Sequence, residues 1–301
     1  MIFPRLRTSP PAGYFFFNAA SENPPLPPEK DIDKKAKIFY NLYKAMPLCQ
    51  GCAENENRNC ICRGKGAPMP ESQTDSIRPI ARIHTDFAEK FGIPRQSGLV
   101  SELTGRIVME PDFRVAEALR GIEQYSHLWL IWQFSREAGR PWHPTVRPPR
   151  LGGNTRVGVF ATRSPCRPNA LGLSSVRLVR VEWDAPDGPA LIVAGADLLD
   201  GTPIYDIKPY LPYVDSHPEA AGGFSAVTAH RQLEVVFPPE LLAKVPPDKQ
   251  QALTGVLAQD PRPGYQHDPG RVYGMSFAGL TVKFTVEDAF QPPRLTVTAV
   301  E

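Results

Sequence analysis

An arginine-rich segment is the part of the sequence best suited to chemistry on an anionic partner. The segment 136–167 contains seven arginines and one acidic residue, Glu137, and it also carries the rings of Trp142, His143 and Phe160. A guanidinium is planar, permanently charged and able to bind two phosphate oxygens at once. Basic groups beside rings that can stack are expected of a surface that binds RNA with an unpaired base. The alternative is an arginine-rich loop that only faces solvent.

A second polar cluster lies at residues 197–210. It contains three aspartates, a lysine and two tyrosines within fourteen residues, around the turn sequence Asp200-Gly201-Thr202-Pro203. That turn signal is weak by itself, because such residues occur wherever a chain reverses direction. If the stretch after the turn is extended, alternation places Asp206 and Lys208 on the same side, either as an ion pair or as part of a polar site.

Two loops offer further polar groups without a familiar nucleotide-binding pattern. The rigid turn 92–98 presents Arg95 and Gln96, and the loop 258–265 is similar in composition. The sequence has no phosphate-binding loop, and no Gly-x-Gly-x-x-Gly follows an expected strand, so a Rossmann enzyme is not supported. The histidines show no metal-ligand spacing, and we expect them to be packed or surface residues.

Four of the five cysteines fall within fourteen residues, at Cys49, Cys52, Cys60 and Cys62, whereas Cys166 stands apart. Their spacing, C-x2-C-x7-C-x-C, is compatible with four thiolates around a zinc ion, which prefers tetrahedral sulfur ligands. The closing C-x-C is tighter than usual, and the residues between are polar. A structural zinc site and four free thiols in a loose segment therefore both remain open.

The composition of the whole chain favours a protein of short elements. Among 301 residues there are 34 prolines, and proline cannot donate to a helix or sheet ladder. The formal net charge of +2 neither demands nor excludes a nucleic-acid partner. No stretch approaches the roughly 20 apolar residues that cross a bilayer, so we expect a cytoplasmic protein with no membrane association.

Changes in texture along the chain predict three parts. Residues 1–76 form a loosely structured N-terminal extension that carries the cysteine cluster and one amphipathic helix at 31–46. Met69 precedes the first clear strand and would be a natural start, so the upstream residues are either an accessory segment or an over-long gene assignment. Residues 77–216 are expected to form a β-barrel, and residues 217–301 a small α+β domain.

The barrel is expected from several short apolar runs punctuated by glycine and proline. Strands are predicted at 77–83, 105–109, 127–134, 157–160, 176–181 and 190–195, with a short helix at 113–119 closed by Gly121. For the second domain we predict a strand at 233–237, one helix over 239–258, and strands at 280–286 and 294–300. The predicted fold class is mainly β.

Seven runs, in one consistent order, resemble the TsaA-like family, the tRNA N6-threonylcarbamoyladenosine methyltransferases. They are Lys90 to Gln96, Ser126 to Trp129, Pro144 to Asn154, Gly158 to Ser164, Arg167 to Asn169, Asp200 to Pro203 with the residues through Pro212, and Val256 to Pro263. The resemblance covers about residues 77–301, and residues 1–70 lie outside it. It implies a homodimer with a β-barrel methyltransferase domain and a small C-terminal domain. It also implies S-adenosyl-L-methionine as cofactor, tRNA as partner, and methylation of N6 on threonylcarbamoyladenosine at position 37 of the anticodon loop.

The resemblance also suggests which residues form the site, and no metal is needed for this reaction. The expected cofactor-binding residues are Pro94, Arg95, Gln96, Arg163, Leu173, Asp197, Leu198, Leu199 and Asp200. Arg163 would suit the methionine carboxylate, and an aspartate the amino group or a ribose hydroxyl. The expected substrate-binding residues are Arg147, Arg150, Arg167, Lys208 and Arg262. Asp206 and Tyr210 are the candidate catalytic bases, because a base would help to remove the proton of the attacking nitrogen.

Three other functions remain open on the sequence alone. The first is a non-catalytic RNA-binding barrel, which would have no reason to bind S-adenosylmethionine. The second is a related methyltransferase that acts on another substrate. The third is a zinc-dependent regulator built on the cysteine cluster, which chelation would unfold or inactivate.

Overall fold

The computed structural model describes residues 76–148, 151, 154–227, 232–263, 268 and 270–301. The chain divides into the units Met1–Gln73 and Thr74–Glu301, and the described residues all belong to the second. The helix expected at 31–46 and the cysteine cluster lie outside the described residues, so the zinc prediction stays a prediction.

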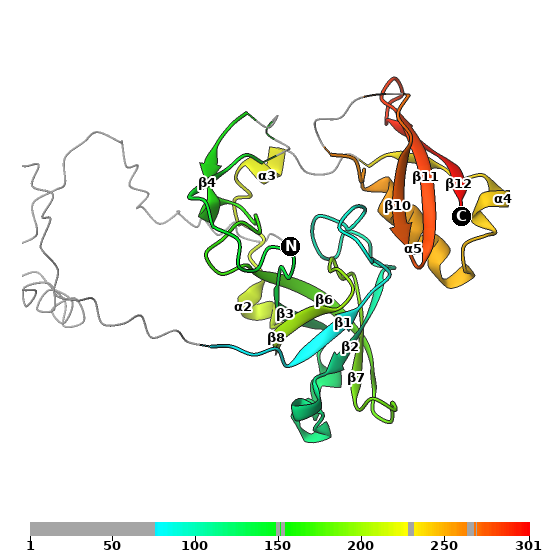
Figure 1. Ribbon diagram of the computed structural model, residues 1–301. Coiled ribbons are helices and arrows are strands. Elements are labelled where there is room, and N and C mark those ends of the chain that lie inside the picture. Colours follow the sequence, from blue (N-terminus) through cyan, green and yellow to red (C-terminus); the bar gives the residue numbers. More distant parts are fainter. Residues whose placement is uncertain (1–75, 149–150, 152–153, 228–231, 264–267, 269) are drawn as a thin grey trace, which may run out of the picture. The chain divides into compact units, whose positions relative to one another are not determined.

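Six antiparallel strands close into a barrel in the order β1-β2-β7-β6-β3-β8 (Figure 1). The strands are β1 (Ala81–His84), β2 (Thr104–Met109), β3 (His127–Gln133), β6 (Leu171–Glu182), β7 (Ala190–Ala194) and β8 (Thr202–Pro209). Period-two alternation sets the inner face: along β3, Leu128, Leu130 and Trp132 are buried, whereas Trp129 and Ile131 stay partly exposed. β7 is buried along its whole length, as its continuous apolar run requires.

Short elements fill the connections of the barrel. Three-residue or four-residue 3-10 helices span Pro111–Phe113, Ala116–Leu119, Ile122–Gln124 and Val159–Ala161. A two-stranded ribbon pairs β4 (Thr145–Val146) with β5 (Val157–Gly158), and the helices α2 (Pro212–Asp215) and α3 (Phe224–Val227) follow β8. None of the helices among the described residues is long and apolar enough to cross a membrane.

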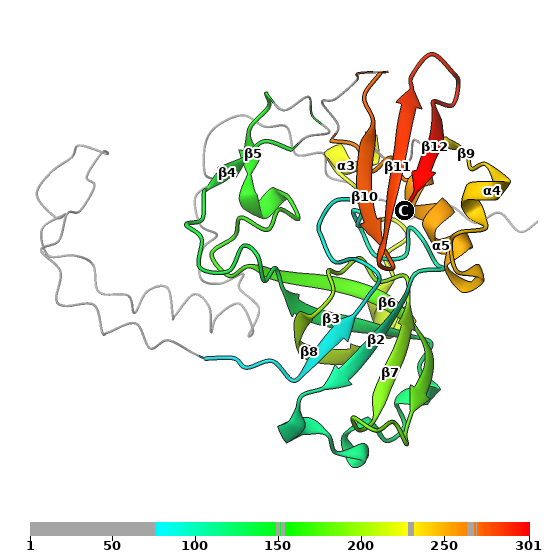
Figure 2. The ribbon, with the colours of Figure 1, turned by 45° about the vertical axis from the view of Figure 1, so that its right-hand side comes forward.

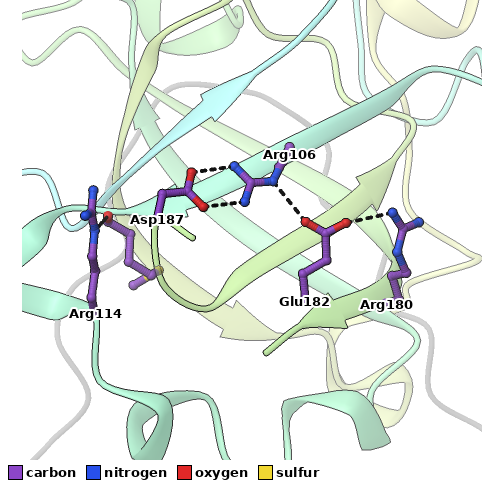
Figure 3. A network of polar contacts seen from close by, with 6 residues as sticks. Arg106, Arg114, Arg180, Glu182 and Asp187 are labelled. Carbon is purple, nitrogen blue, oxygen red and sulfur yellow. Dashed lines mark hydrogen bonds and ion pairs between the residues drawn. The ribbon is translucent and has the colours of Figure 1, made fainter. Parts of the chain in front are cut away.

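A polar network ties β2 to β6 and to the connection between β6 and β7 (Figure 3). The Arg106 guanidinium donates two bonds of 2.6 Å to Asp187 and one of 3.0 Å to Glu182. Glu182 also accepts a 2.7 Å bond from Arg180. The hydrogen bonds from Arg106 lower the pKa of the Asp187 carboxyl to about 2, and the two carboxylates raise the pKa of Arg106. The charges of these four side chains therefore satisfy one another.

The C-terminal part is a four-stranded sheet in the order β10-β11-β12-β9, with helices alongside it (Figure 2). Its elements are β9 (Glu234–Val236), α4 (Pro239–Leu242), α5 (Pro247–Ala258), β10 (Tyr273–Phe277), β11 (Leu280–Glu287) and β12 (Arg294–Val300). β9 runs parallel to β12, and the other pairs are antiparallel. The apolar face of α5, with Leu253, Val256 and Leu257, joins the sheet residues in one buried core.

The long loop between β1 and β2 belongs to the barrel in sequence but packs into this second core. Phe87, Val100 and Leu103 are buried in the same cluster as the residues of α5 and the sheet. The Phe87 ring meets Phe277 edge-on, with 5.5 Å between ring centroids. The Asp86 carboxylate forms an ion pair of 2.7 Å with the Lys249 ammonium of α5. The loop is thus fixed by apolar burial and by charge at once.

The mainly β fold class and the closed barrel are confirmed, and several predictions of elements were wrong in detail. The helix predicted at 113–119 is a pair of 3-10 turns. The helix predicted at 239–258 is two helices, because Pro246 and Pro247 break the backbone ladder and begin α5. The strand predicted at 157–160 ends at Gly158. β10 was not predicted, although its buried Tyr273, Met275 and Phe277 alternate with Gly274 and Ser276.

One close approach in the barrel gives a stability test. A Cβ added to Gly172 of β6 would lie 2.3 Å from Cε2 of Trp132, whose indole is buried and hydrogen-bonded. We expect Gly172→Ala to destabilise the fold by about 1–3 kcal/mol, because the indole must move out of a packed site. Urea unfolding followed by tryptophan fluorescence measures this. Gly274→Ala is the matched control, since a Cβ on this strand glycine meets nothing within 4 Å; equal losses in both variants would contradict the packing argument.

Candidate active site

A cavity of about 610 Å³ opens on the outer face of the barrel. Four segments that are far apart in sequence line it: residues 90–96, 129–136, 162–173 and 197–202. The volume falls in the range of small-molecule pockets, and its walls combine apolar surface with a few convergent polar groups. Trp129 and Ile131, the outward-facing residues of β3, form part of the wall.

A chain of hydrogen bonds runs from the barrel wall into this cavity. The Trp132 Nε1–H donates to the Ser174 hydroxyl at 3.0 Å, and that hydroxyl donates to Oδ1 of Asp197 at 2.6 Å. Ser174 is 1 % exposed, so its geometry is fixed by these two partners. The Asp197 carboxylate is therefore held in a fixed orientation at the edge of the pocket, where it can accept a hydrogen bond from a ligand.

Burial raises the pKa of the Asp197 carboxyl, because a charge removed from water is disfavoured. The Ser174 hydroxyl, the backbone N–H groups around the carboxylate, and the charge of Arg163 oppose the rise. A carboxylate that remains partly desolvated gains more than a solvated one from a ligand ammonium or hydroxyl that binds to it.

Five cations line the cavity, at Lys90, Arg95, Arg136, Arg163 and Arg167, against one carboxylate, Asp197. Glu137 lies nearby but is engaged by Lys90 and, at 2.7 Å, by Arg140. The hydrogen bond from Lys90 holds the pKa of Glu137 below its ordinary value. The balance of charge at the cavity mouth therefore favours an anionic ligand or substrate.

Polar contacts that involve the loop between β1 and β2 orient two of these arginines, Arg163 and Arg95. The Arg163 guanidinium donates to the side-chain oxygen of Gln96, whose amide in turn donates to the Arg95 carbonyl oxygen. Arg95 donates at 3.3 Å to the carbonyl oxygen of Arg262 in the C-terminal domain. Residues from both parts of the chain thus meet at this wall.

An aromatic pair stands beside the cationic wall. The rings of Trp142 and Phe160 are stacked, with centroids 6.3 Å apart, and Phe160 is 70 % exposed. The Arg167 guanidinium lies 5.7 Å from the Phe160 ring centroid and donates at 2.6 Å to the Thr162 carbonyl oxygen. Exposed rings beside arginines offer a stacking surface for unpaired bases.

The structure brings most of the predicted cofactor residues together. Pro94, Arg95, Gln96, Arg163, Leu173, Asp197 and Leu199 all line the cavity. Leu198 and Asp200 do not, because their side chains contact other parts of the barrel. Leu198 is buried in the barrel core, and Asp200 accepts a bond from the Thr85 N–H and pairs with His84 at 3.3 Å. Cofactor binding by any of the nine stays a prediction.

The candidate bases lie beside the cavity rather than in its wall. Asp206 pairs across the sheet with Ile131, and Lys208 with Trp129, so these side chains share the outer face. Asp206 and Lys208 form the expected ion pair at 2.9 Å. The Tyr210 ring packs against Trp129 at 5.5 Å between centroids.

The predicted substrate arginines are dispersed. Arg147 is exposed after β4, Arg167 lines the cavity, and Arg150 lies outside the described residues. Arg262 is 4 % exposed and is held by two carboxylates, so its guanidinium is not presented to a phosphate here.

Sequence reasoning missed several cavity residues: Trp132, Gln133, Phe134, Ser174 and Thr202 are in the wall or directly support it. Trp132 was visible only as part of an apolar strand. Ser174 carries no sequence signal, since its role comes from two long-range hydrogen bonds.

A closed antiparallel barrel with a cationic cavity in its wall is a β-barrel architecture, distinct from the doubly wound nucleotide-binding folds. Residues 82–216 match the family described as the tRNA-methyltransferase O N-terminal domain, and residues 230–301 match the TrmO C-terminal domain. The chain therefore belongs to the TrmO family.

The similarity to individual relatives agrees with this assignment. The chain is 41 % identical over 218 residues to the tRNA (adenine(37)-N6)-methyltransferase of Escherichia coli (strain K12), covering 70 % of this chain and 92 % of the relative. It is 51 % identical over 164 residues to the protein of the same name from Eikenella corrodens, covering 54 % and 92 %. The crystal structure of TrmO from Pseudomonas aeruginosa superposes with a TM-score of 0.59 at 34 % identity, over 76 % of this chain and 99 % of that one.

The raised pKa of Asp197 predicts an unusual gain of stability on neutralisation. Above its folded pKa the ionised Asp197 costs folding free energy, so stability rises as the pH falls through that pKa. We expect Asp197→Asn to melt on the order of 2 °C above the wild type at pH 7.5. This advantage should vanish in acid, where the wild-type carboxyl is itself neutral.

Differential scanning fluorimetry across a pH series measures both effects. Asp200→Asn is the control, because Asp200 accepts a hydrogen bond from the Thr85 N–H and lies 3.3 Å from the His84 ring nitrogen, so this variant should lose stability instead. An Asp197→Asn variant that melts below the wild type at pH 7.5 would contradict the burial argument.

Proposed function

We propose that this protein transfers the methyl group of S-adenosyl-L-methionine to N6 of threonylcarbamoyladenosine at position 37 of tRNA. Membership of the TrmO family and the names of its relatives support methylation of adenine 37 in tRNA. The threonylcarbamoyl group is the finer part of the proposal and comes from the family resemblance. The observation that carries the methyltransferase proposal is that Arg95, Arg163 and Asp197, from three distant segments, line one cavity.

The donor set of the cavity fits S-adenosylmethionine. Its volume of about 610 Å³ suits a ligand of that size, and its walls supply both signs of charge. We assign Arg163 to the methionine carboxylate, and the oriented Asp197 to the amino group or a ribose hydroxyl. A related protein of Pyrococcus abyssi, 36 % identical over 156 residues, is named a probable S-adenosyl-L-methionine-binding protein, which supports this use of the cavity.

When bound, the cofactor supplies an electrophilic methyl carbon, and the protein has to hold the attacking nitrogen in line with it. Apolar walls from Trp129, Ile131 and Trp132 limit the access of water to that point. We propose that Arg167, Arg147 and Lys208 hold anticodon-loop phosphates, with Phe160 and Trp142 available for stacking. Arg150, outside the described residues, remains assigned to the same role.

The N6 proton has to leave during transfer, because the methyl group takes its place. Since the nitrogen lone pair is delocalised into the ring and the carbamoyl group, a base that removes this proton would make the nitrogen a better nucleophile. Asp206 and Tyr210 remain our candidate bases. Asp206 shares the outer sheet face with the cavity residue Ile131, and the Tyr210 ring packs on the cavity residue Trp129. An adenine that extends beyond this wall would therefore reach Asp206 or Tyr210. The homodimer and the cytoplasmic location are part of the same proposal and rest on the family resemblance.

A methyl-transfer assay with labelled S-adenosylmethionine tests the function. We expect label in total tRNA from cells that make the threonylcarbamoyl modification, and none in tRNA from cells that lack it. Arg163→Ala should lower kcat/KM by at least about 10-fold, because a charge-assisted hydrogen bond to the cofactor is lost. Arg120→Ala, an exposed arginine outside the cavity, should leave the rate unchanged.

Equal labelling of both tRNA pools would contradict the threonylcarbamoyl substrate while keeping the methyltransferase. Absence of label from a folded protein that still binds tRNA would favour the non-catalytic RNA-binding barrel.

A further inference from the structure

A buried arginine in the C-terminal domain has no part in the proposed chemistry. Arg262 is 4 % exposed, and both edges of its guanidinium are occupied. Asp260 accepts bonds of 2.9 and 3.0 Å from it, and Asp288 accepts bonds of 3.1 and 3.0 Å. The two carboxylates raise the pKa of Arg262 against the effect of its burial. We call Arg262, Asp260 and Asp288 the arginine clamp.

The clamp fixes a tight turn directly after α5. Asp260 has a φ of 52°, a left-handed conformation that aspartate tolerates better than most residues. Its side chain also accepts a 3.3 Å bond from the Arg262 N–H, so backbone and side chain of Arg262 are held by the same carboxylate. The orientation of the Arg262 carbonyl oxygen therefore depends on the clamp.

That carbonyl oxygen points toward the candidate active site. It accepts a 3.3 Å bond from the Arg95 guanidinium, and Arg95 lines the cavity of about 610 Å³. Arg95 also lines a smaller cavity of about 220 Å³, whose other walls include Asp260 and Arg262. Arg95 thus lines both the small cavity beside the arginine clamp and the proposed cofactor site.

We propose that Arg262 is a positioning residue: through the clamp it presents its own carbonyl oxygen to Arg95 and so aims the Arg95 guanidinium at the anionic end of the bound cofactor. This inference rests on the proposed function. It gives Arg262 a positioning role in place of the direct substrate contact expected from the sequence. A lysine cannot reproduce the clamp, because an ammonium lacks the planar fork that serves two carboxylates at once. A clamp that broke would leave two carboxylates without their buried counter-charge.

A double-mutant cycle on the full-length protein tests the coupling. Isothermal titration calorimetry with S-adenosylmethionine and S-adenosylhomocysteine gives Kd for the wild type, Arg262→Lys, Arg95→Ala and the double variant. We expect each single variant to weaken binding by about 10-fold, and the double variant to lose no more than Arg95→Ala alone, because both changes act through one guanidinium. In methyl transfer the loss should appear in KM for the cofactor more than in kcat.

Arg294→Ala is the matched control for loss of stability alone. Arg294 pairs with Glu234 at 3.1 Å in the same domain and lines none of the cavities described. It should lower the melting temperature without changing Kd. If Arg262→Lys does not fold, Asp288→Asn takes its place in the cycle, since this carboxylate is 38 % exposed and its neutralisation loosens only half of the clamp.

Losses that multiply in the double variant, or a folded clamp variant with wild-type Kd, would overturn the inference and leave the proposed function intact. A wild-type protein that binds neither ligand would overturn the proposed function and the inference together.

Discussion

The structure depends on the burial of one loop in a core that it does not belong to by sequence. The loop between β1 and β2 inserts Phe87, Val100 and Leu103 into the core formed by α5 and the C-terminal sheet. Three large apolar side chains removed from water contribute several kcal/mol, of the order of 1.5–3 kcal/mol each, which is a sizeable share of the stability of a domain. Because the same loop carries Arg95 and Gln96, the cavity wall is held from outside the barrel.

The charges of the cavity follow a consistent logic. An excess of guanidinium and ammonium groups faces solvent and suits an anionic partner, while the one carboxylate in the wall, Asp197, is desolvated and held by Ser174. The nearby acid, Glu137, forms ion pairs with Lys90 and Arg140, so its negative charge repels a bound anion less. Ion pairs elsewhere, such as that of Arg106 with Asp187, satisfy their charges locally.

Local patterns predicted the strands well where one face is buried and the other is wet. β3, β11 and β12 were expected within one or two residues, because alternation leaves few other registers. Predictions failed where proline or glycine decided the geometry, as at Pro246, where one expected helix became two. β10 was missed although Tyr273, Met275 and Phe277 are buried and alternate with Gly274 and Ser276 on the opposite face.

The sequence by itself determined the residue types available to the site, the alternation that closes the barrel, and the motif order that identifies the family. Only the tertiary structure decided which of those residues meet. Asp197 and Asp200 look equivalent in sequence, yet Asp197 lines the cavity whereas Asp200 contacts His84. Arg262 looked like a phosphate ligand, but two carboxylates 2 and 26 residues away enclose it. Long-range contacts decide these roles. The local sequence pattern does not reveal them, because tertiary packing, rather than the neighbouring residues in the chain, determines which partner a side chain meets.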